Sequence, residues 1–157
     1  MYEFISAHHL ELFLRLILAV IFGWLIGYER EVLGKAAGTR TFGLVALGSA
    51  LFSIVSSEGF SEYIGQSAAD PTRVTSLIVS GIGFLGGGLI IFRGERVEGL
   101  TTAAGLWATA AVGIAFGRGL YTLAIFSSIL ILILLFTSRW FHPEKKSSQK
   151  GGALDSI

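Results

Sequence analysis

Acidic side chains gather before the third apolar stretch of this chain, where they could offer oxygen ligands to a cation. Asp70 is the central candidate, and Glu58 or Glu62 could join it within the same polar segment. Carboxylate oxygens are the ligands that Mg²⁺ and other hard cations take in proteins. Arg73 lies nearby and would neutralise part of such a site. The alternative is a structural role, because Asp70 followed by Pro71 is typical of the start of a helix.

A second group of charges follows the first apolar stretch and recurs between the third and the fourth. Charges at the edge of a membrane are usually paired or functional. We therefore predict an ion-pair cluster that joins the two segments, with Glu29 and Arg40 nearest the membrane. The alternative is a solvated rim of charges on the cytoplasmic side. The residues concerned are Glu29, Arg30, Glu31, Lys35, Arg40, Arg93, Glu95, Arg96 and Glu98.

Three glycines match the pattern G-x-G-x-x-G, which in a Rossmann fold holds a pyrophosphate at the start of a helix. They are Gly81, Gly83 and Gly86, and they lie inside an uncharged stretch. No alternation of strands and helices surrounds them, so dinucleotide binding is not expected. The segment that ends in Gly34 and Lys35 also lacks the residues of a phosphate-binding loop.

Catalysis is not expected from this chain. It has no cysteine and only three histidines, none of which lies within an apolar stretch. His8, His9 and Glu11 could hold a metal, but a charged cluster at the membrane interface is the simpler interpretation, with Glu11 paired to Arg15 one turn later. We therefore predict a protein that is not an enzyme and has no catalytic residue. Mg²⁺ is the one candidate cofactor, with Asp70 as its ligand.

The apolar stretches are long enough to cross a bilayer as helices. Hydrophobic residues make up 52% of the 157 residues, and mean hydropathy is +0.69. In hydrocarbon every backbone polar group must be bonded within the chain, which favours helices. We predict an all-α, polytopic integral membrane bundle of five transmembrane helices. The spans fall in residues 12–28, 41–57, 74–92, 99–117 and 119–138.

Basic residues set the predicted orientation, because cytoplasmic loops carry an excess of them. With the N-terminus outside and the C-terminus in the cytoplasm, nine basic residues lie inside and only Arg73 and Arg118 lie outside. Residues 1–142 then form the membrane domain, and residues 143–157 form a polar cytoplasmic tail that is expected to be disordered. The net charge of +1 gives no signature of nucleic-acid binding. The lipid bilayer is the expected partner.

Small residues predict which helices touch, because they let helix backbones approach in lipid. They line one face of each of spans one, three and four, so we expect these three to form the packed centre, with the aliphatic fifth span facing lipid. Trp107 is expected to serve in packing rather than to stack on a cofactor. The alternative is a cavity or ion path along the same faces. The small residues are Gly23, Gly27, Ser76, Ser80, Gly83, Gly87, Thr101, Gly105, Thr109, Gly113 and Gly117.

Three segments resemble the signature blocks of the MgtC/SapB family. They read GYEREVLGKAAGTRTFGLVALGSALF, DPTRVTSLIVSGIGFLGGGLI and GLTTAAGLWATAAVGIAFGRG, and together they cover most of residues 27–119. The resemblance implies a multi-pass protein of the bacterial inner membrane. Some members are linked to magnesium limitation and to intracellular survival, and hence to virulence. Some act by regulating other membrane machinery rather than by carrying Mg²⁺.

The resemblance also implies which positions matter, and two positions depart from it. Many relatives have glutamine where this chain has Leu77 and alanine where it has Gly87, so a polar group is missing from the third span. Longer relatives carry a soluble C-terminal domain. The matched motif positions are Glu29, Arg30, Gly38, Arg40, Thr41, Asp70, Arg73, Ser80, Gly81, Gly83, Phe84, Gly86, Gly88, Gly99, Leu100, Thr101, Thr102, Ala103, Ala104 and Trp107.

Two functional hypotheses follow. The first is an MgtC/SapB-like inner-membrane protein of magnesium or ion homeostasis that regulates membrane machinery. It would form a small homo-oligomer, with a dimer favoured, and would contact another membrane protein. The second is a cation transporter or channel, with Asp70 at its outer mouth and Glu29 at its inner mouth.

Overall fold

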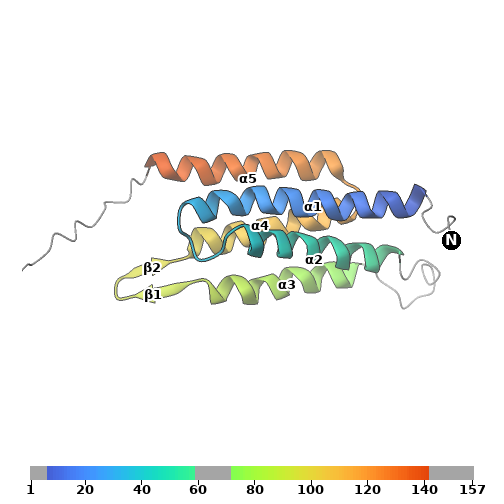
Figure 1. The fold of residues 1–157 in the computed structure, drawn as a ribbon. Coiled ribbons are helices and arrows are strands. Elements are labelled where there is room, and N and C mark those ends of the chain that lie inside the picture. Colours follow the sequence, from blue (N-terminus) through green and yellow to red (C-terminus); the bar gives the residue numbers. More distant parts are fainter. Residues whose placement is uncertain (1–6, 59–71, 142–157) are drawn as a thin grey trace, which may run out of the picture.

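The chain folds as a bundle of helices in a computed structural model that describes residues 7–58 and 72–141. Within these residues five helices run side by side (Figure 1). This confirms the predicted all-α class. Three of them, the first, second and fourth, are long and apolar enough by length and composition to cross a membrane. The number of spans and the orientation of the termini stay predictions. The helices are α1 (Ala7–Val32), α2 (Thr39–Glu58), α3 (Thr72–Gly88), α4 (Leu100–Gly117) and α5 (Tyr121–Phe141).

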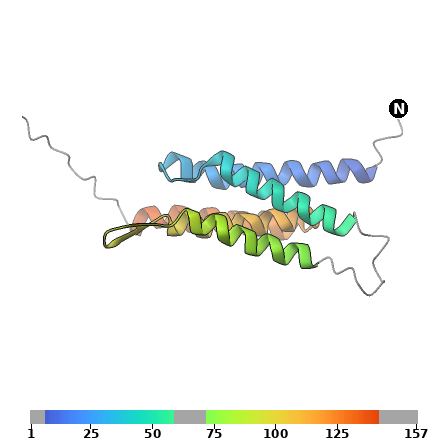
Figure 2. The ribbon, with the colours of Figure 1, turned by 90° about the horizontal axis from the view of Figure 1, so that it is seen from below.

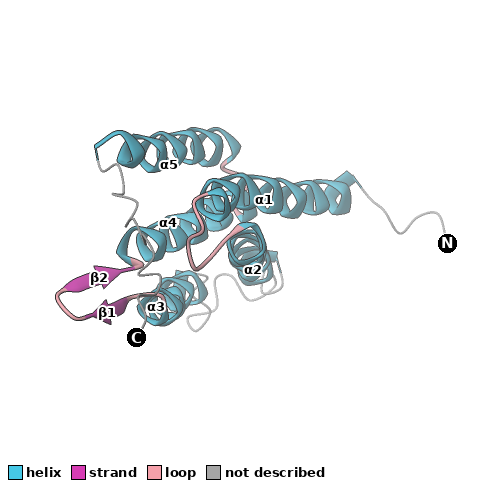
Figure 3. Ribbon diagram, turned by 60° about the vertical axis from the view of Figure 1, so that its left-hand side comes forward, coloured by secondary structure: helices cyan, strands magenta, loops and turns pink. Residues whose placement is uncertain are grey.

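The packed centre consists of α1, α2 and α4, with α3 and α5 on opposite sides of it (Figure 3). We expected the third span, rather than the second, to pack in this centre. That expectation is wrong, because α2 packs between α1 and α4 and α3 lies outside them. The face of α2 that it buries carries mostly small side chains, including Ala46, Ala50 and Ser53. Such a face lets two neighbouring helices approach at once.

Glycines bring the three central backbones into contact. A Cβ atom on Gly23 of α1 would lie 2.6 Å from the Cβ atom of Ala46, and one on Gly117 of α4 would lie 2.5 Å from the carbonyl oxygen of Ala50. A Cβ atom on Gly113 would overlap the carbonyl oxygen of Ala46. The predicted packing role of these glycines is confirmed. We call these contacts of α2 with α1 and α4 the central seam.

The predicted packing face of the third span points away from the bundle. Ser76, Ser80, Gly83 and Gly87 are all exposed. Within residues 7–58 and 72–141, no heavy atom outside the helix itself and the chain neighbours would lie within 4 Å of a Cβ atom on Gly83 or Gly87. The expected burial of this face is therefore wrong. We call these four residues the outer face of α3.

The third apolar stretch is shorter as a helix than predicted. α3 ends at Gly88, and the chain continues as a hairpin of β1 (Ile91–Arg93) and β2 (Arg96–Glu98). The strands are antiparallel, with Phe92 opposite Val97, and Figure 2 shows the hairpin projecting beyond the end of the helices. Three successive glycines weaken a helix, and the β-branched and aromatic residues that follow suit a strand.

Gly99 turns the chain from the hairpin into α4. Its φ angle is +86°, and a Cβ atom there would overlap the carbonyl oxygen of Leu89. Only glycine adopts this conformation readily. The family motif position Gly99 thus has a conformational explanation.

α4 and α5 form the tight helical hairpin that the sequence predicts. Only three residues separate them, and Gly119 adopts a φ angle of +72° between the two helices. The outer side of α5 is exposed and aliphatic, as expected for a helix that faces lipid. Trp107 is 52% exposed on α4. It therefore does not pack inside the single chain, and its packing role stays a prediction.

Candidate functional site

A buried ion pair occupies the C-terminal part of α1. Glu29 is 4% exposed and Arg30 is 2% exposed. The guanidinium Nε of Arg30 donates to carboxylate Oε2 of Glu29. Nη2 of Arg30 donates across to the carbonyl oxygen of Leu135 at 3.5 Å, which links α1 to α5. Both charged residues were predicted as functional candidates, and the structure brings them together.

The second oxygen of this carboxylate has no donor. Among the described residues, Oε1 of Glu29 is the buried side-chain atom without a hydrogen-bond partner. An unpaired buried polar group destabilises a fold by about 1–3 kcal/mol. A buried charge is tolerated when a counter-charge compensates it, and Arg30 supplies that charge. The free oxygen lone pairs make Oε1 able to accept a proton or a cation.

Glu31 fixes the entry into α2. Its Oε2 accepts a hydrogen bond from the backbone N–H of Thr39 at 2.8 Å, and a second one from the hydroxyl of Thr39. These bonds satisfy donors at the start of α2 that have no partner within the helix. A Cβ atom on Gly38 would lie 2.7 Å from the same Oε2. Our sequence interpretation missed this role, although the Gly38–Thr39 pair at the start of a helix was a usable signal.

Glu29 of the first charged segment and Arg93 of the second form separate ion pairs in the structure. Glu29 pairs with its neighbour Arg30 rather than with Arg40, which is exposed. Arg93 instead pairs with Glu98 at 3.3 Å within the hairpin. Because the hairpin projects away from the bundle, its charges stay apart from the end of α1. A cluster that joins the two segments stays a prediction.

The opposite end of the bundle carries a second polar network. Arg15 bonds to Glu11 at 2.5 Å, as the spacing predicted, and donates to the carbonyl oxygen of Gly117 at 3.1 Å. A cation suits this position because α4 ends there with unpaired carbonyl groups. Nε2 of His8 lies 3.4 Å from Oε2 of Glu58. Within the described residues no group of three or more His, Asp or Glu side chains could hold a metal.

The other predicted positions are scattered. Asp70 lies outside the described residues, so its metal and capping roles stay predictions, and Arg73 is exposed. Gly86 is buried. A Cβ atom placed on it would lie 3.7 Å from the Cβ atom of Ala103. Thr102 is also buried, whereas Thr101 is exposed. The motif residues thus occupy several surfaces rather than one pocket.

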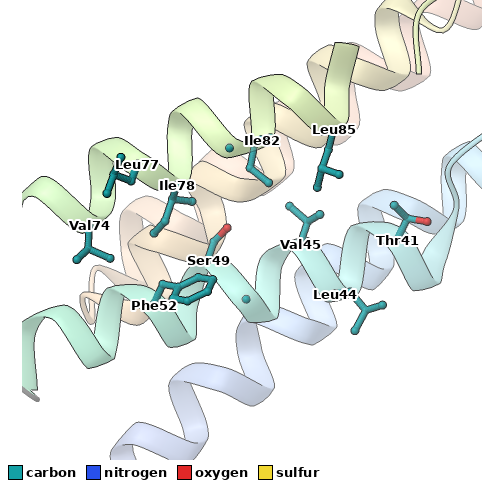
Figure 4. Close-up of a pocket in the computed structure, with 12 residues that line it drawn as sticks. Thr41, Leu44, Val45, Ser49, Phe52, Val74, Leu77, Ile78, Ile82 and Leu85 are labelled. Carbon is teal, nitrogen blue, oxygen red and sulfur yellow. The ribbon is translucent and has the colours of Figure 1, made fainter. Parts of the chain in front are cut away.

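An apolar groove of about 750 Å³ lies between α2 and α3. Figure 4 shows its walls, with Val45 and Phe52 on α2 facing Ile78 and Ile82 on α3. Leu77 also lines the groove and contributes an aliphatic side chain to it. Two predicted motif positions, Thr41 and Gly81, lie on its walls. Sequence reasoning did not predict this groove.

Long apolar helices, a glycine-packed seam and a compensated ion pair in its interior are together typical of an integral membrane protein. The model of the MgtC family matches residues 16–143 of the chain. The chain therefore belongs to the MgtC family, as the resemblance of its three blocks suggested.

Curated relatives share the matched region. The chain is 46% identical over 127 residues to the putative magnesium transporter YhiD of Escherichia coli (strain K12), covering 80% of this chain and 59% of that protein. It is 46% identical over 114 residues to the protein MgtC of Brucella abortus (strain 2308), and the matched region covers 73% of this chain and 45% of that protein. It is 37% identical over 146 residues to an uncharacterized protein of Haemophilus influenzae, and the matched region covers 88% of this chain and 61% of that protein.

The chain spans less than two thirds of the length of these relatives. No solved structure matches it.

Proposed function

We propose that this protein is a multi-pass protein of the bacterial inner membrane that serves magnesium or ion homeostasis by regulating other membrane machinery. Membership of the MgtC family and the similarity to the putative magnesium transporter YhiD support the link to magnesium. The protein is not an enzyme in this proposal. It forms a small homo-oligomer, contacts another membrane protein and binds no nucleic acid.

The closed interior of the bundle carries the regulatory part of the proposal. The charge of Glu29 is held by Arg30, and α1 and α4 meet α2 through glycines that leave no space for a single added carbon atom. Mg²⁺ dehydrates reluctantly and usually keeps several waters. A seam this tight supports a role through protein contacts rather than through ion passage.

A second candidate function is cation transport, and one observation favours it. Oε1 of Glu29 is buried without a hydrogen-bond donor in the described part of the chain. A carboxylate oxygen in that state is a potential ligand for a cation at an inner mouth. Asp70 would stand at the outer mouth in this alternative.

Reconstitution and complementation separate the two candidates. We expect purified protein in liposomes to give no Mg²⁺ uptake above protein-free liposomes, measured with an entrapped Mg²⁺ dye. We expect a deletion strain to grow poorly in low Mg²⁺ and to recover with the wild-type gene. Uptake that is lost in both Glu29→Gln and Asp70→Asn would establish transport and refute the regulator. Normal growth of the deletion strain would remove both candidates.

A further inference from the structure

The groove between α2 and α3 is an apolar channel along the side of the bundle. Figure 4 shows that it runs from Thr41 and Leu85 at one end to Phe52 and Val74 at the other. Among its lining residues, Leu77 is 69% exposed and Phe52 is 59% exposed. The groove follows α2, which is long and apolar enough to cross a membrane. In a bilayer its walls therefore face the acyl chains.

Two glycines keep the groove hollow. Gly48 on α2 and Gly81 on α3 line it, and a Cβ atom placed on either would meet no atom of the described residues within 4 Å outside its own helix. Thr41 and Phe52, at the two ends, lie about 16 Å apart along α2 at about 1.5 Å per residue.

These dimensions suit a slender occupant. Dividing the groove volume of about 750 Å³ by its length of about 16 Å gives a mean cross-section of about 45 Å². A helix about 10–12 Å across has a cross-section of about 80 Å² or more. The groove therefore fits an extended hydrocarbon chain better than the body of a further helix.

The apolar walls do not by themselves select an occupant inside a bilayer. Lipid tails are as apolar as the groove, so no hydrophobic driving force distinguishes one tail from another. What remains is packing along the groove and the charge at its two ends. The head group of a bound lipid is therefore selected by the charged residues at those ends.

Arginines are frequent at the Thr41 end of the groove. Figure 1 shows that the start of α2 lies at the same end of the bundle as the β hairpin. Arg40 directly precedes Thr41, and Arg93 and Arg96 stand in the hairpin; all three arginines are exposed. Arg93 pairs with Glu98. Neither Arg40 nor Arg96 forms an ion pair with a residue that the structure describes.

The carboxylates at this end leave Arg40 available. Glu95 and Glu98 belong to the hairpin and offset its two arginines. Glu31 accepts its hydrogen bonds from Thr39. At about 100° per residue, Thr41 lies about 200° around α2 from Thr39. The carboxylate of Glu31 and the groove are therefore on opposite sides of the helix.

The other end of the groove is less suited to an anion. Arg73 directly precedes Val74 there and is exposed, but the adjoining segment carries Glu58, Glu62 and Asp70 in sequence. We also predict the Thr41 end on the cytoplasmic side, where the membrane surface carries anionic lipids. Charge therefore favours an anionic head group at the Thr41 end.

We propose that the groove between α2 and α3 holds one acyl chain of an anionic phospholipid, with its phosphate beside Arg40 and Thr41. The guanidinium donates hydrogen bonds to phosphate oxygens, a pairing that suits arginine, and the hydroxyl of Thr41 is a further donor. A zwitterionic phospholipid binds more weakly because its cationic group offsets the phosphate charge. The inference needs the location in a bilayer but not the role in magnesium homeostasis.

Lipid titration followed by native mass spectrometry tests the head group. The probes are palmitoyl-oleoyl phosphatidylglycerol, which is anionic, and phosphatidylcholine with the same acyl chains, which is zwitterionic. We expect delipidated wild-type protein in mild detergent to bind one phosphatidylglycerol per chain, and to bind it more tightly than phosphatidylcholine. Arg40→Gln should lower the affinity for phosphatidylglycerol about fivefold, the effect of one arginine near an anionic surface. Its affinity for phosphatidylcholine should stay nearly unchanged.

Filling the groove tests the position of the acyl chain. Gly48→Leu should fold, because a Cβ atom there meets no described neighbour, and should lose binding of both lipids while eluting as the wild type does in size-exclusion chromatography. Ala111→Leu adds similar bulk at an exposed position of α4 and is the matched control, which should bind both lipids normally. Arg73→Gln is the control for Arg40→Gln and should keep the wild-type affinity for phosphatidylglycerol.

Four outcomes would overturn the proposal. Equal affinity of the wild type for the two lipids would remove the selection by charge. Unchanged lipid binding in Gly48→Leu would show that the acyl chain lies elsewhere. A larger loss in Arg73→Gln than in Arg40→Gln would place the head group at the opposite end. A lower number of subunits in Gly48→Leu, counted in the same spectra, would mean that another protein chain fills the groove.

Discussion

The central seam and α3 use the same small residues for opposite purposes. In the seam, Gly23 and Gly113 press helix backbones together until no added carbon atom fits. On α3, Gly83 and Gly87 face outward, and among the described residues no atom outside the helix lies within 4 Å of a Cβ atom placed on either. The comparison teaches that a stripe of small residues on an apolar helix does not by itself tell whether that face is packed within the chain or left exposed.

The largest effect is expected from filling the seam. Gly113→Leu should prevent stable folding. Overpacking against movable side chains already costs about 1–3 kcal/mol, and the cost here is larger because the obstacle is the backbone of Ala46. The measurement is the yield of monodisperse protein by size-exclusion chromatography. Gly83→Leu is the matched control on α3 and should be recovered as folded protein. Equal recovery of Gly113→Leu and Gly83→Leu would show that the central seam is no more tightly packed than the outer face of α3.

A slightly smaller effect is expected at the ion pair beside the seam. Arg30→Met should lower the free energy of unfolding by about 3–5 kcal/mol, because it leaves the buried carboxylate of Glu29 without its counter-charge. The measurement is unfolding of the purified protein in mixed micelles with increasing SDS. The double variant Glu29→Gln with Arg30→Met should recover part of the loss. A double variant less stable than Arg30→Met would show that the two side chains do not compensate each other.

The start of α2 should give an effect of intermediate size. Glu31→Gln keeps the shape of the side chain but removes the charge that accepts two hydrogen bonds from Thr39. Loss of a helix cap destabilises by about 0.5–2 kcal/mol, and we expect a value in this range from the same unfolding experiment. Glu98→Gln, which affects only the exposed pair with Arg93, is the control and should change stability by less. A larger loss of stability in Glu98→Gln than in Glu31→Gln would mean that the hairpin contributes more to the stability of the bundle than the start of α2 does.

The smallest effect on folding is expected on the outer face of α3. Ser76→Ala removes a hydroxyl that bonds only to the carbonyl oxygen of Arg73 in its own helix. Exposed substitutions of this kind usually change stability by about 0.5 kcal/mol or less. A larger loss in dilute mixed micelles, where copies are separated, would mean that this face packs within the single chain after all.

Much of the fold could be predicted from the residue pattern. The apolar stretches predicted the helices, and the short Gly117–Gly119 segment predicted the tight turn between α4 and α5, because glycine permits the positive φ angle found there. Glu11 and Arg15 paired as their spacing implied. These features depend on residues that are close in sequence, so local chemistry was sufficient.

The candidate site was predicted only in part. Glu29 and Arg30 were identified as candidates, but their partners were not, because burial against α5 depends on how distant helices pack. The predicted third span ended at residue 92, four residues beyond the end of α3 at Gly88. The error arose because apolar β-branched residues suit a strand as well as a buried helix. Hydropathy alone does not separate the two.

The sequence by itself determined that this is a helical membrane-type chain of the MgtC family. The length and hydropathy of the apolar stretches and the family motifs depend only on residues that are close in sequence. Only the tertiary structure decided that α2 rather than α3 joins the central seam and that Glu29 is held by Arg30. The physical reason is that several helices carry small residues and all could pack. The choice among them depends on the shapes of whole faces that meet across long separations in sequence.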